Sequence, residues 1–438
     1  MPQPPISHNN DTGERPIMTT GTAERHLSID AVRGFAVLGI LLMNIVGMGL
    51  PSFAYINPTY AGGSTGGDFW TWAVNNVLTD GKMRALFTLL FGASMLLIAE
   101  RAEGRRPGPV STHYRRMFWL LLFGLAHAAF FWFGDVLVPY AIAGILVFPF
   151  RKLSPRVQLA VGVTVLAALL AKNVWQAQQI EALHAAAMAP GAPATAVKAW
   201  QQASMALGPP PEAAKADIAA FGGDFASALK ARLGMVALMY FVMIPTDMLP
   251  ETIGQIFVGM ALFRMGFFTL GWSSRAYGAV IAVGYLVCVP VTAWLASRIA
   301  AAGFDPLVLH EQEVWQQTTR TMIGMAHASV LLLLVRAGAA SWLVQRLAAA
   351  GRMAFSNYLM TSIITTFLFC GFGFGLYGQL SRFELLYVVL AIWAFILLWS
   401  QPWLERFHYG PFEWAWRSLV QWKPQRFAKT PKPAAATV

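Results

Sequence analysis

Cysteine and charge are both scarce in this chain of 438 residues. Only Cys288 and Cys370 occur, each inside a long apolar run, so we expect neither a disulfide framework nor a metal site. Charged residues make up 12% of the chain, about half of the roughly 25% typical of soluble domains. Because 56% of the residues are hydrophobic, this composition excludes an ordinary soluble protein.

The motifs of common soluble enzymes are missing as well. The sequence has no Walker loop, no dinucleotide-binding glycine motif after a strand, no HExxH motif and no nucleophile elbow. These absences argue against a soluble hydrolase, kinase or dehydrogenase. The net charge of +11 does not indicate a nucleic-acid partner, because Lys and Arg gather in short loops beside apolar runs, where the positive-inside rule places them.

Long apolar runs dominate what is present. A helix of about 20 apolar residues crosses a hydrocarbon core of ~30 Å, and several runs approach this length. The runs do not alternate as the strands of a membrane barrel do. We therefore expect an all-α, polytopic integral membrane helical bundle in the lipid bilayer, with about ten transmembrane helices and a range of ten to twelve. The expected spans cover residues 31–50, 82–99, 117–134, 136–150, 157–175, 252–268, 276–297, 320–336, 353–372 and 383–400.

Basic residues in the short loops predict the orientation of these helices. The positive-inside rule places the loops richest in Lys and Arg, together with both termini, on the cytoplasmic side. Residues 1–25 then form a disordered cytoplasmic N-terminus, 26–422 a single transmembrane domain and 423–438 a basic cytoplasmic tail. The side is marked by Arg101, Arg105, Arg106, Arg115, Arg116, Arg151, Lys152, Arg156, Arg336, Arg346, Arg352, Lys423, Arg426, Lys429 and Lys432.

Two segments do not fit a simple series of spans. Residues 233–249 are apolar enough to cross, but a separate crossing would reverse the later basic loops, and Pro245 and Pro250 indicate a broken helix. We therefore expect 233–249 to be re-entrant or interfacial. Residues 176–230 are rich in Ala and interrupted by Pro, which predicts an extracytoplasmic helical loop that acts as a cap or, alternatively, as a substrate lid.

Polar residues within the first apolar run are the first functional indication. Asp30 and Arg33 are three residues apart and can pair on one helix face. Arg33 and Asn44 are eleven residues apart, so they lie on nearly the same face, about 16 Å apart along the axis. Such a polar stripe suits a substrate-binding surface. The alternative is an ion pair at the helix end and an interhelical Asn hydrogen bond, both of which stabilise membrane helices.

The sequence DGKMR places Asp80, Lys82 and Arg84 just before the second span. Lys and Arg at this position can bind an anionic group of a substrate. Long basic side chains at the entrance of a membrane helix also serve as snorkelling anchors, so both interpretations stay open.

Two histidines lie deep inside apolar runs. His127 is followed by Asp135, and a neutral imidazole is the usual general base near neutral pH. On one straight helix these residues would lie about 80° apart in azimuth and ~12 Å apart in height, so we expect no direct contact. The alternative for His127 is a hydrogen-bonded packing residue, which is the favoured interpretation for His327.

Six motifs follow one another along the chain: SIDAVRGFAVLGILLMNI, DGKMRALFTLLFGASM, GLAHAAFFWFGDVLVPYAIAGIL, FVGMALFRMGF, GRMAFSNYLMTS and YGPFEWAWRSL. In this order they resemble the YeiB-like family of bacterial inner-membrane proteins, which carry domain of unknown function four-one-eight. The resemblance covers residues 25–420. It implies a multi-pass protein of the bacterial inner membrane. The family looks related to transmembrane acyltransferases, which take an acyl group from cytoplasmic acyl-CoA or acetyl-CoA.

This resemblance implies an acyl-transfer scaffold without the usual first-helix base. The glycan-decorating acyltransferases carry an Arg followed eleven positions later by a catalytic His, and here those positions are Arg33 and Asn44. The lysosomal heparan acetyltransferase has its catalytic His eleven residues further on, where this chain has Tyr55. The best remaining base is His127, with Asp135 as a second acid or base.

The expected site follows from the resemblance and the polar stripe together. Arg33, Arg115 and Arg116 would bind the phosphates of CoA, and the acceptor would be a small molecule or a glycan. The alternatives are a transporter or exporter of a small amphipathic molecule, or a non-catalytic partner protein in the envelope. A homo-oligomer is compatible with each of them.

Overall fold

The computed structural model describes residues 22–210 and 212–430, with side chains from Leu27 onward. Most of the expected disordered N-terminus and the last residues of the basic tail lie outside this part of the chain. The described part consists of helices joined by loops and has no strand, only an isolated bridge between Phe407 and Ala428. The all-α expectation is therefore confirmed.

Seven helical stretches of the described chain are long and apolar enough to cross a membrane. They are Leu27–Gly49, Gly66–Ala102, Pro155–Met188, Phe225–Arg264, Ser274–Ala301, Pro306–Arg336 and Leu385–Arg406. Three expected spans form shorter or less apolar helices: α4 (Pro109–Phe130), α5 (Leu137–Val147) and α15 (Ala354–Phe369). These long apolar helices pack around a common core, which establishes a polytopic helical membrane bundle.

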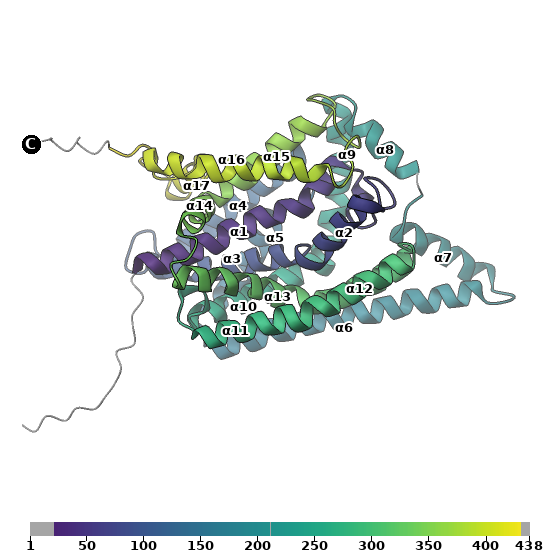
Figure 1. Cartoon of the computed structure of the whole chain (residues 1–438), viewed down its shortest axis with the longest axis horizontal. Helices are drawn as coiled ribbons and strands as arrows, with labels where there is room; N and C mark the ends of the chain where they lie inside the picture. Colours follow the sequence, from purple (N-terminus) through teal and green to yellow (C-terminus); the bar gives the residue numbers. More distant parts are fainter. Residues whose placement is uncertain (1–21, 211, 431–438) are drawn as a thin grey trace, which may run out of the picture.

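The remaining helices keep the labels of Figure 1. The first span belongs to α1 (Thr22–Gly49), and the next stretch divides into α2 (Gly66–Leu78) and α3 (Lys82–Ala102). Later spans comprise α6 (Pro155–Met188), α9 (Phe225–Leu238), α10 (Leu249–Arg264), α11 (Ser274–Val283), α12 (Val289–Ala301), α13 (Pro306–Arg336) and α16 (Leu385–Arg406). Four helices lie between or after them: α7 (Ala194–Leu207), α8 (Glu212–Phe221), α14 (Ser341–Arg352) and α17 (Pro411–Gln421).

The expected break in residues 233–249 is absent. The chain continues from α9 through a π-helical turn at Met239–Met248 into α10, giving one helix over Phe225–Arg264. Pro245 lies inside the π turn and Pro250 at the start of α10, so widening of the helix accommodates the prolines. One long helix replaces the expected re-entrant segment and separate span, so the parity of the later helices is unchanged.

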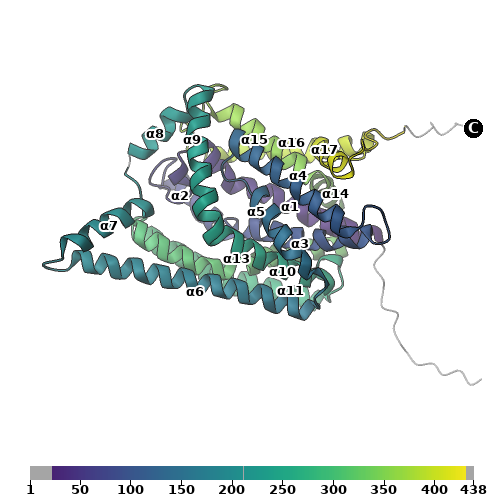
Figure 2. The same ribbon diagram turned by 180° about the vertical axis from the view of Figure 1, so that it is seen from behind.

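The basic loops meet at one end of the bundle, which we call the basic end. Arg264 donates hydrogen bonds of 2.5 Å to the carbonyls of Arg151 and Leu153, and Arg336 donates to those of Leu270 and Trp272. The start of α1 and helix α17 also lie at this end, whereas α7 and α8 lie at the opposite, far end (Figure 1). Figure 2 shows the same arrangement from behind, with α6 and α9 reaching toward the far end.

Glycines allow the central helices to cross closely. A Cβ on Gly34 of α1 would collide with the carbonyl of Leu347, and one on Gly351 of α14 would collide with the carbonyl of Asp30. Gly92 of α3 and Gly259 of α10 are in similar contact with backbone of the facing helix. Small residues at such crossings let membrane helices associate through close backbone packing.

The Ala-rich segment 176–230 folds as helices at the far end. It comprises the end of α6, then α7, α8 and the beginning of α9. Asp217 of α8 accepts hydrogen bonds from the backbone N–H and the hydroxyl of Ser52, at 3.0 and 2.7 Å. The hydroxyl of Tyr60 donates to the carbonyl of Pro209 at 2.6 Å. These bonds fasten the segment over the short 3₁₀ helix Ser52–Tyr55 that follows α1.

Helix α17 is anchored at the basic end by the half-buried side chain of Glu413. Glu413 accepts hydrogen bonds from the backbone N–H groups of Phe355 and Ser356, at 2.8 and 3.0 Å, and from the Ser356 hydroxyl. It thereby caps the first turn of α15. Burial raises the pKa of Glu413 above its usual value, and the hydrogen bonds from Ser356 and Phe355 oppose that rise.

Candidate functional site

His127 and Asp135 form a buried hydrogen-bonded pair, which we call the dyad. Nδ1 of His127 lies 2.8 Å from Oδ1 of Asp135, and the two side chains are 1% and 0% exposed. The expectation that they would not touch was wrong, because it assumed one straight helix. Instead α4 ends at Phe130, and the chain turns back before α5 begins at Leu137, which returns Asp135 to His127.

The hydrogen bonds of the dyad fix the chemistry of the imidazole. A carboxylate only accepts, so Nδ1–H of His127 donates to Asp135, whose Oδ2 also accepts from the Val138 N–H at 2.8 Å. Nε2 of His127 is buried and has no hydrogen-bond partner within the described residues. With Nδ1 protonated, Nε2 carries a free lone pair, which is the arrangement that a general base requires.

His327 provides a contrast within the same bundle. Its Nε2 donates to the carbonyl of Leu78 at 2.9 Å, and its Nδ1 accepts from the hydroxyl of Tyr285 at 2.7 Å. Both ring nitrogens are therefore occupied, which supports a packing role for His327.

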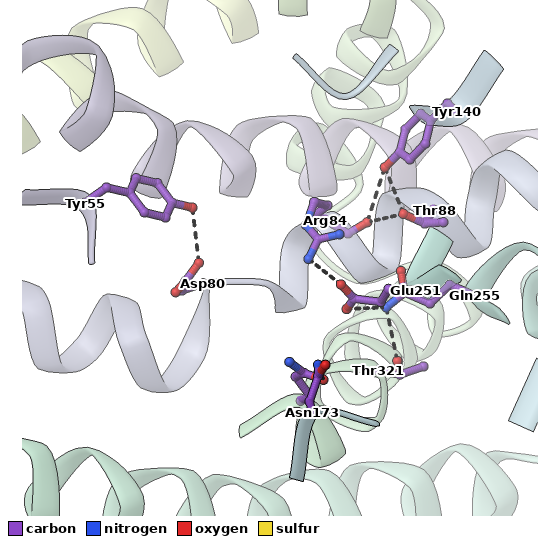
Figure 3. Close-up of polar contacts among 10 residues, drawn as sticks. Tyr55, Asp80, Arg84, Thr88, Tyr140, Asn173, Glu251, Gln255 and Thr321 are labelled. Carbon is purple, nitrogen blue, oxygen red and sulfur yellow. Dashed lines mark hydrogen bonds and ion pairs between the residues drawn. The ribbon is translucent and has the colours of Figure 1, made fainter. Parts of the chain in front are cut away.

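A group of charged side chains lies between α3, α10 and α13. We call Asp80, Lys82, Arg84, Glu251, Glu313 and Arg320 the charge cluster. Arg84 Nη2 donates to Glu251 Oε2 at 2.7 Å, and Glu251 Oε1 accepts from Gln255 at 3.1 Å. Gln255 also lies 3.4 Å from the hydroxyl of Thr321 on α13 (Figure 3). The sequence predicted Arg84 as a binding residue, and the structure pairs it with a carboxylate from a distant helix.

Asp80 and Lys82 stand at the far-end side of the charge cluster. Asp80 accepts a 3.2 Å hydrogen bond from the hydroxyl of Tyr55 (Figure 3), and the fully buried Lys82 donates to the carbonyl of Asn76 at 2.5 Å. Burial raises the pKa of Tyr55 well above its usual value, and the Asp80 carboxylate raises it further. A Lys with no exposed surface is not a snorkelling anchor, so the anchor interpretation does not hold for Lys82.

Tyr140 connects the dyad with the charge cluster. Its hydroxyl lies 2.8 Å from that of Thr88 and 3.5 Å from the carbonyl of Arg84 (Figure 3). Tyr140 stands on α5, about one turn after the helix begins at Leu137, and Asp135 lies just before that start. Both Tyr140 and Tyr358 are close enough to Asp135 to interact with it electrostatically.

The polar residues of α1 are separated in the structure. Arg33 pairs with Asp30 at 2.7 Å and donates to the Ser94 hydroxyl at 3.0 Å, so the predicted ion pair is present at the basic end. Asn44 is half-buried and shares a helix face with Gly47 and Met48, which pack against Trp132 and Thr365 respectively. Asn44 therefore faces the part of the bundle that contains the turn between α4 and α5.

The predicted phosphate-binding arginines lie at the basic end. Arg116 stacks on the ring of Trp416, with 4.0 Å between its Cζ and the ring centroid, and it interacts electrostatically with Arg33 and Arg417. This gathering of three guanidinium groups favours an anion. Arg115, the residue before Arg116 on α4, is half-buried. Arg116 and His127 are eleven residues apart on α4, which places both on nearly one face, about 16 Å apart.

Several partners in the site come from other helices and were not predicted as site residues. They are Glu251, Gln255, Glu313, Arg320 and Tyr140. One signal was available: Glu251 and Gln255 are four residues apart, as are Gln316 and Arg320, so each pair places two polar groups on one helix face within an apolar run.

The fold and the buried polar groups define a polytopic helical membrane protein. A family model described as "Protein of unknown function (DUF418)" matches residues 262–423. The uncharacterized protein YeiB of Escherichia coli (strain K12) is 30% identical over 403 residues, covering 91% of this chain and 96% of that protein. YxaH of Bacillus subtilis (strain 168), also uncharacterized, is 27% identical over 424 residues, or 93% and 98% of the two chains.

The chain therefore belongs to the DUF418 family of YeiB-like membrane proteins. No solved structure matches it significantly.

Proposed function

We propose that this protein is a membrane-embedded acyltransferase in which His127 is the general base. One observation carries the proposal: Nδ1–H of the buried imidazole is held by Asp135, while Nε2 has no partner within the described chain. A polar atom left unpaired in a membrane bundle costs about 1–3 kcal/mol, so a fold that keeps it has a use for it. A substrate hydroxyl is the partner that such a nitrogen fits.

The reaction that suits this base is transfer of an acyl group from a thioester to a hydroxyl. Nε2 of His127 takes the hydroxyl proton while the oxygen attacks the thioester carbonyl carbon. The carbon–sulfur bond then breaks, and the imidazolium returns the proton to the departing CoA thiolate. Asp135 stabilises the imidazolium and holds its orientation throughout.

The basic end is where acyl-CoA would bind. The guanidinium groups of Arg33, Arg116 and Arg417 suit the phosphates of CoA, and Trp416 supports the plane of Arg116. The acyltransferases that this family resembles carry an Arg and a His eleven residues apart on their first helix. Here Arg116 and His127 show the same spacing on α4, although α1 lacks the His.

A groove at the basic end suits CoA less well than these arginines do. A groove of about 520 Å³ lies between α1, α14 and α16, and Asp30 and Glu405 line it together with Arg352 and Lys429. Its opposite charges cancel, so it offers no net attraction to a polyanion. The arginines around Arg116 are therefore the better site for the donor.

The direction of transfer follows from the orientation that we propose. Placing the basic end in the cytoplasm satisfies the positive-inside rule and puts both termini there. The membrane is then the bacterial inner membrane, acyl-CoA approaches from the cytoplasm, and the acceptor approaches the charge cluster from the far end.

The test is incubation of the purified protein, in lipid nanodiscs, with acetyl-CoA labelled on the acetyl group. Release of CoA or formation of an acetylated product supports the proposal. A protein that neither binds CoA nor turns it over would refute it.

Transport is the second candidate, and the charge cluster favours it. The Arg84–Glu251 pair and the fully buried Lys82 lie within helices that cross the membrane, where ionisable groups often mark a substrate or proton path. Uptake of a small amphipathic solute into proteoliposomes that depends on Asp80 or Asp135, but not on CoA, would favour transport. Full cellular function after His127→Ala and Arg33→Ala would instead indicate a non-catalytic envelope partner.

A further inference from the structure

A row of polar side chains on α13 has no role in the acyl-transfer step described above. Gln312, Gln316 and Arg320 recur every four residues, so they follow one face of the helix. Gln312 and Gln316 are each 1% exposed. Both amide atoms of Gln312, Nε2 of Gln316 and Nε of Arg320 have no hydrogen-bond partner in the described part of the chain. We call Gln312 and Gln316 the amide row.

Unpaired buried amides are costly in a membrane bundle. Each unsatisfied group carries a desolvation penalty, and Leu at the same position would remove it. Two such residues in successive turns of one helix therefore indicate that something outside the chain supplies the missing hydrogen bonds.

The amide row leads into the charge cluster. Arg320 packs against Gly81, where an added Cβ would collide with its side chain, and it interacts electrostatically with Lys82, Glu251 and Glu313. Further polar atoms lack partners here among the described residues, namely Nη1 of Arg84 and Oε1 of Gln255. Figure 3 shows Glu251 and Gln255 between Arg84 and Thr321, the latter a residue of α13.

The charges around this surface cancel. The cations Lys82, Arg84 and Arg320 are matched by three carboxylates, those of Asp80, Glu251 and Glu313. A ligand with net charge of either sign would therefore gain little from the cluster as a whole. The unpaired atoms include donors, on Gln316, Arg84 and Arg320, as well as acceptors, on Gln312 and Gln255.

We infer that the amide row and the charge cluster bind an uncharged polyhydroxylated molecule, such as a neutral sugar. A hydroxyl both donates and accepts, so a series of hydroxyls can satisfy neighbouring amides and guanidinium groups without adding charge. The role of this molecule as the acyl acceptor rests on the proposed function, whereas its binding does not.

The position of the surface agrees with an acceptor. Tyr140 links Arg84 to the neighbourhood of Asp135, so a hydroxyl bound at the cluster lies on the side of the bundle that leads to the dyad. The segment 176–230 is held at the far end by the hydrogen bond between Asp217 and Ser52, and it covers the 3₁₀ helix Ser52–Tyr55. Tyr55 of that helix donates a hydrogen bond to Asp80 of the charge cluster. Movement of this segment would open the approach from the far end.

The experiment measures binding of unlabelled glucose and trehalose to the full chain in lipid nanodiscs free of sugar-based detergent, by isothermal titration calorimetry without any acyl-CoA. Glucose 6-phosphate serves as the charged comparison. The variants are Gln312→Leu and Gln316→Leu, alone and combined. Gln345→Leu is the matched control, because it changes an amide on α14 at the basic end.

We expect a neutral sugar to bind the wild-type protein and the control equally, and the double variant to bind it at least roughly tenfold more weakly. Thermal unfolding should show the double variant folded, and sugar should stabilise only the wild type and the control. Failure of both sugars to bind the wild-type protein would overturn the inference, as would tighter binding of glucose 6-phosphate. Acetyl-CoA turnover is measured separately, so a protein that binds sugar but is inert toward acetyl-CoA refutes only the proposed function.

Discussion

The dyad gives the sharpest prediction, because substitution of its two members should lower kcat by different amounts. His127→Ala removes the only nitrogen that can take the substrate proton in the proposed reaction. Asp135→Asn keeps the size of the side chain and an oxygen that can accept from Nδ1–H, but removes the negative charge that stabilises the imidazolium. The two substitutions thus separate loss of the base from loss of its electrostatic support.

The expected magnitudes follow from the geometry. A positioned general base contributes roughly 10²–10⁴-fold to a rate, so His127→Ala should lower kcat by that factor. The 2.8 Å bond between His127 and Asp135 is charge-assisted once the ring is protonated and is shielded from solvent. Such a bond contributes about 1.5–3 kcal/mol, which corresponds to a loss of roughly 10- to 150-fold for Asp135→Asn.

The assay is CoA release from acetyl-CoA in nanodiscs at saturating donor, with CoA affinity measured in parallel. His327→Ala is the matched control, since both nitrogens of His327 are occupied by Tyr285 and Leu78. That variant should lose stability but keep its kcat. Equal losses in His127→Ala and His327→Ala, or full activity in His127→Ala, would refute the assignment of the base.

Three further predictions concern the rest of the bundle. Glu251→Leu leaves the guanidinium of Arg84 without its partner and should lower the free energy of unfolding by about 3–5 kcal/mol. Combining it with Arg84→Met should restore most of the lost stability. Equal destabilisation of the single and double variants in thermal unfolding would contradict this expectation. Arg116→Gln should weaken CoA binding roughly tenfold in calorimetry without altering the fold, and unchanged affinity would exclude Arg116 from the donor site. Burial raises the pKa of Glu413, so the folded state favours the protonated carboxyl. The stabilisation that this carboxyl gives to the docking of α17 is therefore complete below the unfolded pKa of about 4.3, and it is lost as pH rises through the folded pKa. Hydrogen exchange of residues 411–421, corrected for its intrinsic pH dependence, should therefore increase with pH in the wild type but not in Glu413→Gln.

The helices could be predicted from the sequence because the bilayer imposes their length. Each expected span begins or ends within a few residues of a helix in the structure, including the short α5 and α15. The error at 233–249 came from treating proline as a break. A π turn instead widened the helix around Pro245, and the outcome depended on neighbouring helices that the local sequence does not describe.

The candidate site was predictable one residue at a time, but its pairings were not. His127, Asp135 and Arg84 stood out because polar groups are rare in apolar runs. The contact between His127 and Asp135 depends on where α4 ends, and the contact between Arg84 and Glu251 depends on a helix 167 residues further along the chain. Neither distance follows from spacing on a single helix.

The crossing of α1 and α14 has a consequence for biosynthesis. Gly34 and Gly351 bring the two backbones into contact, and Arg33 reaches the carbonyl of Gly351 across 318 residues of sequence. At 5–20 residues per second, translation separates the synthesis of these two helices by on the order of 15 to 60 seconds. During that interval α1 lacks the helix that it packs against, and its ionised groups need a temporary partner. This protein should therefore depend strongly on the insertase that shelters nascent helices, and depletion of that insertase should leave α1 as the first segment exposed to proteolysis.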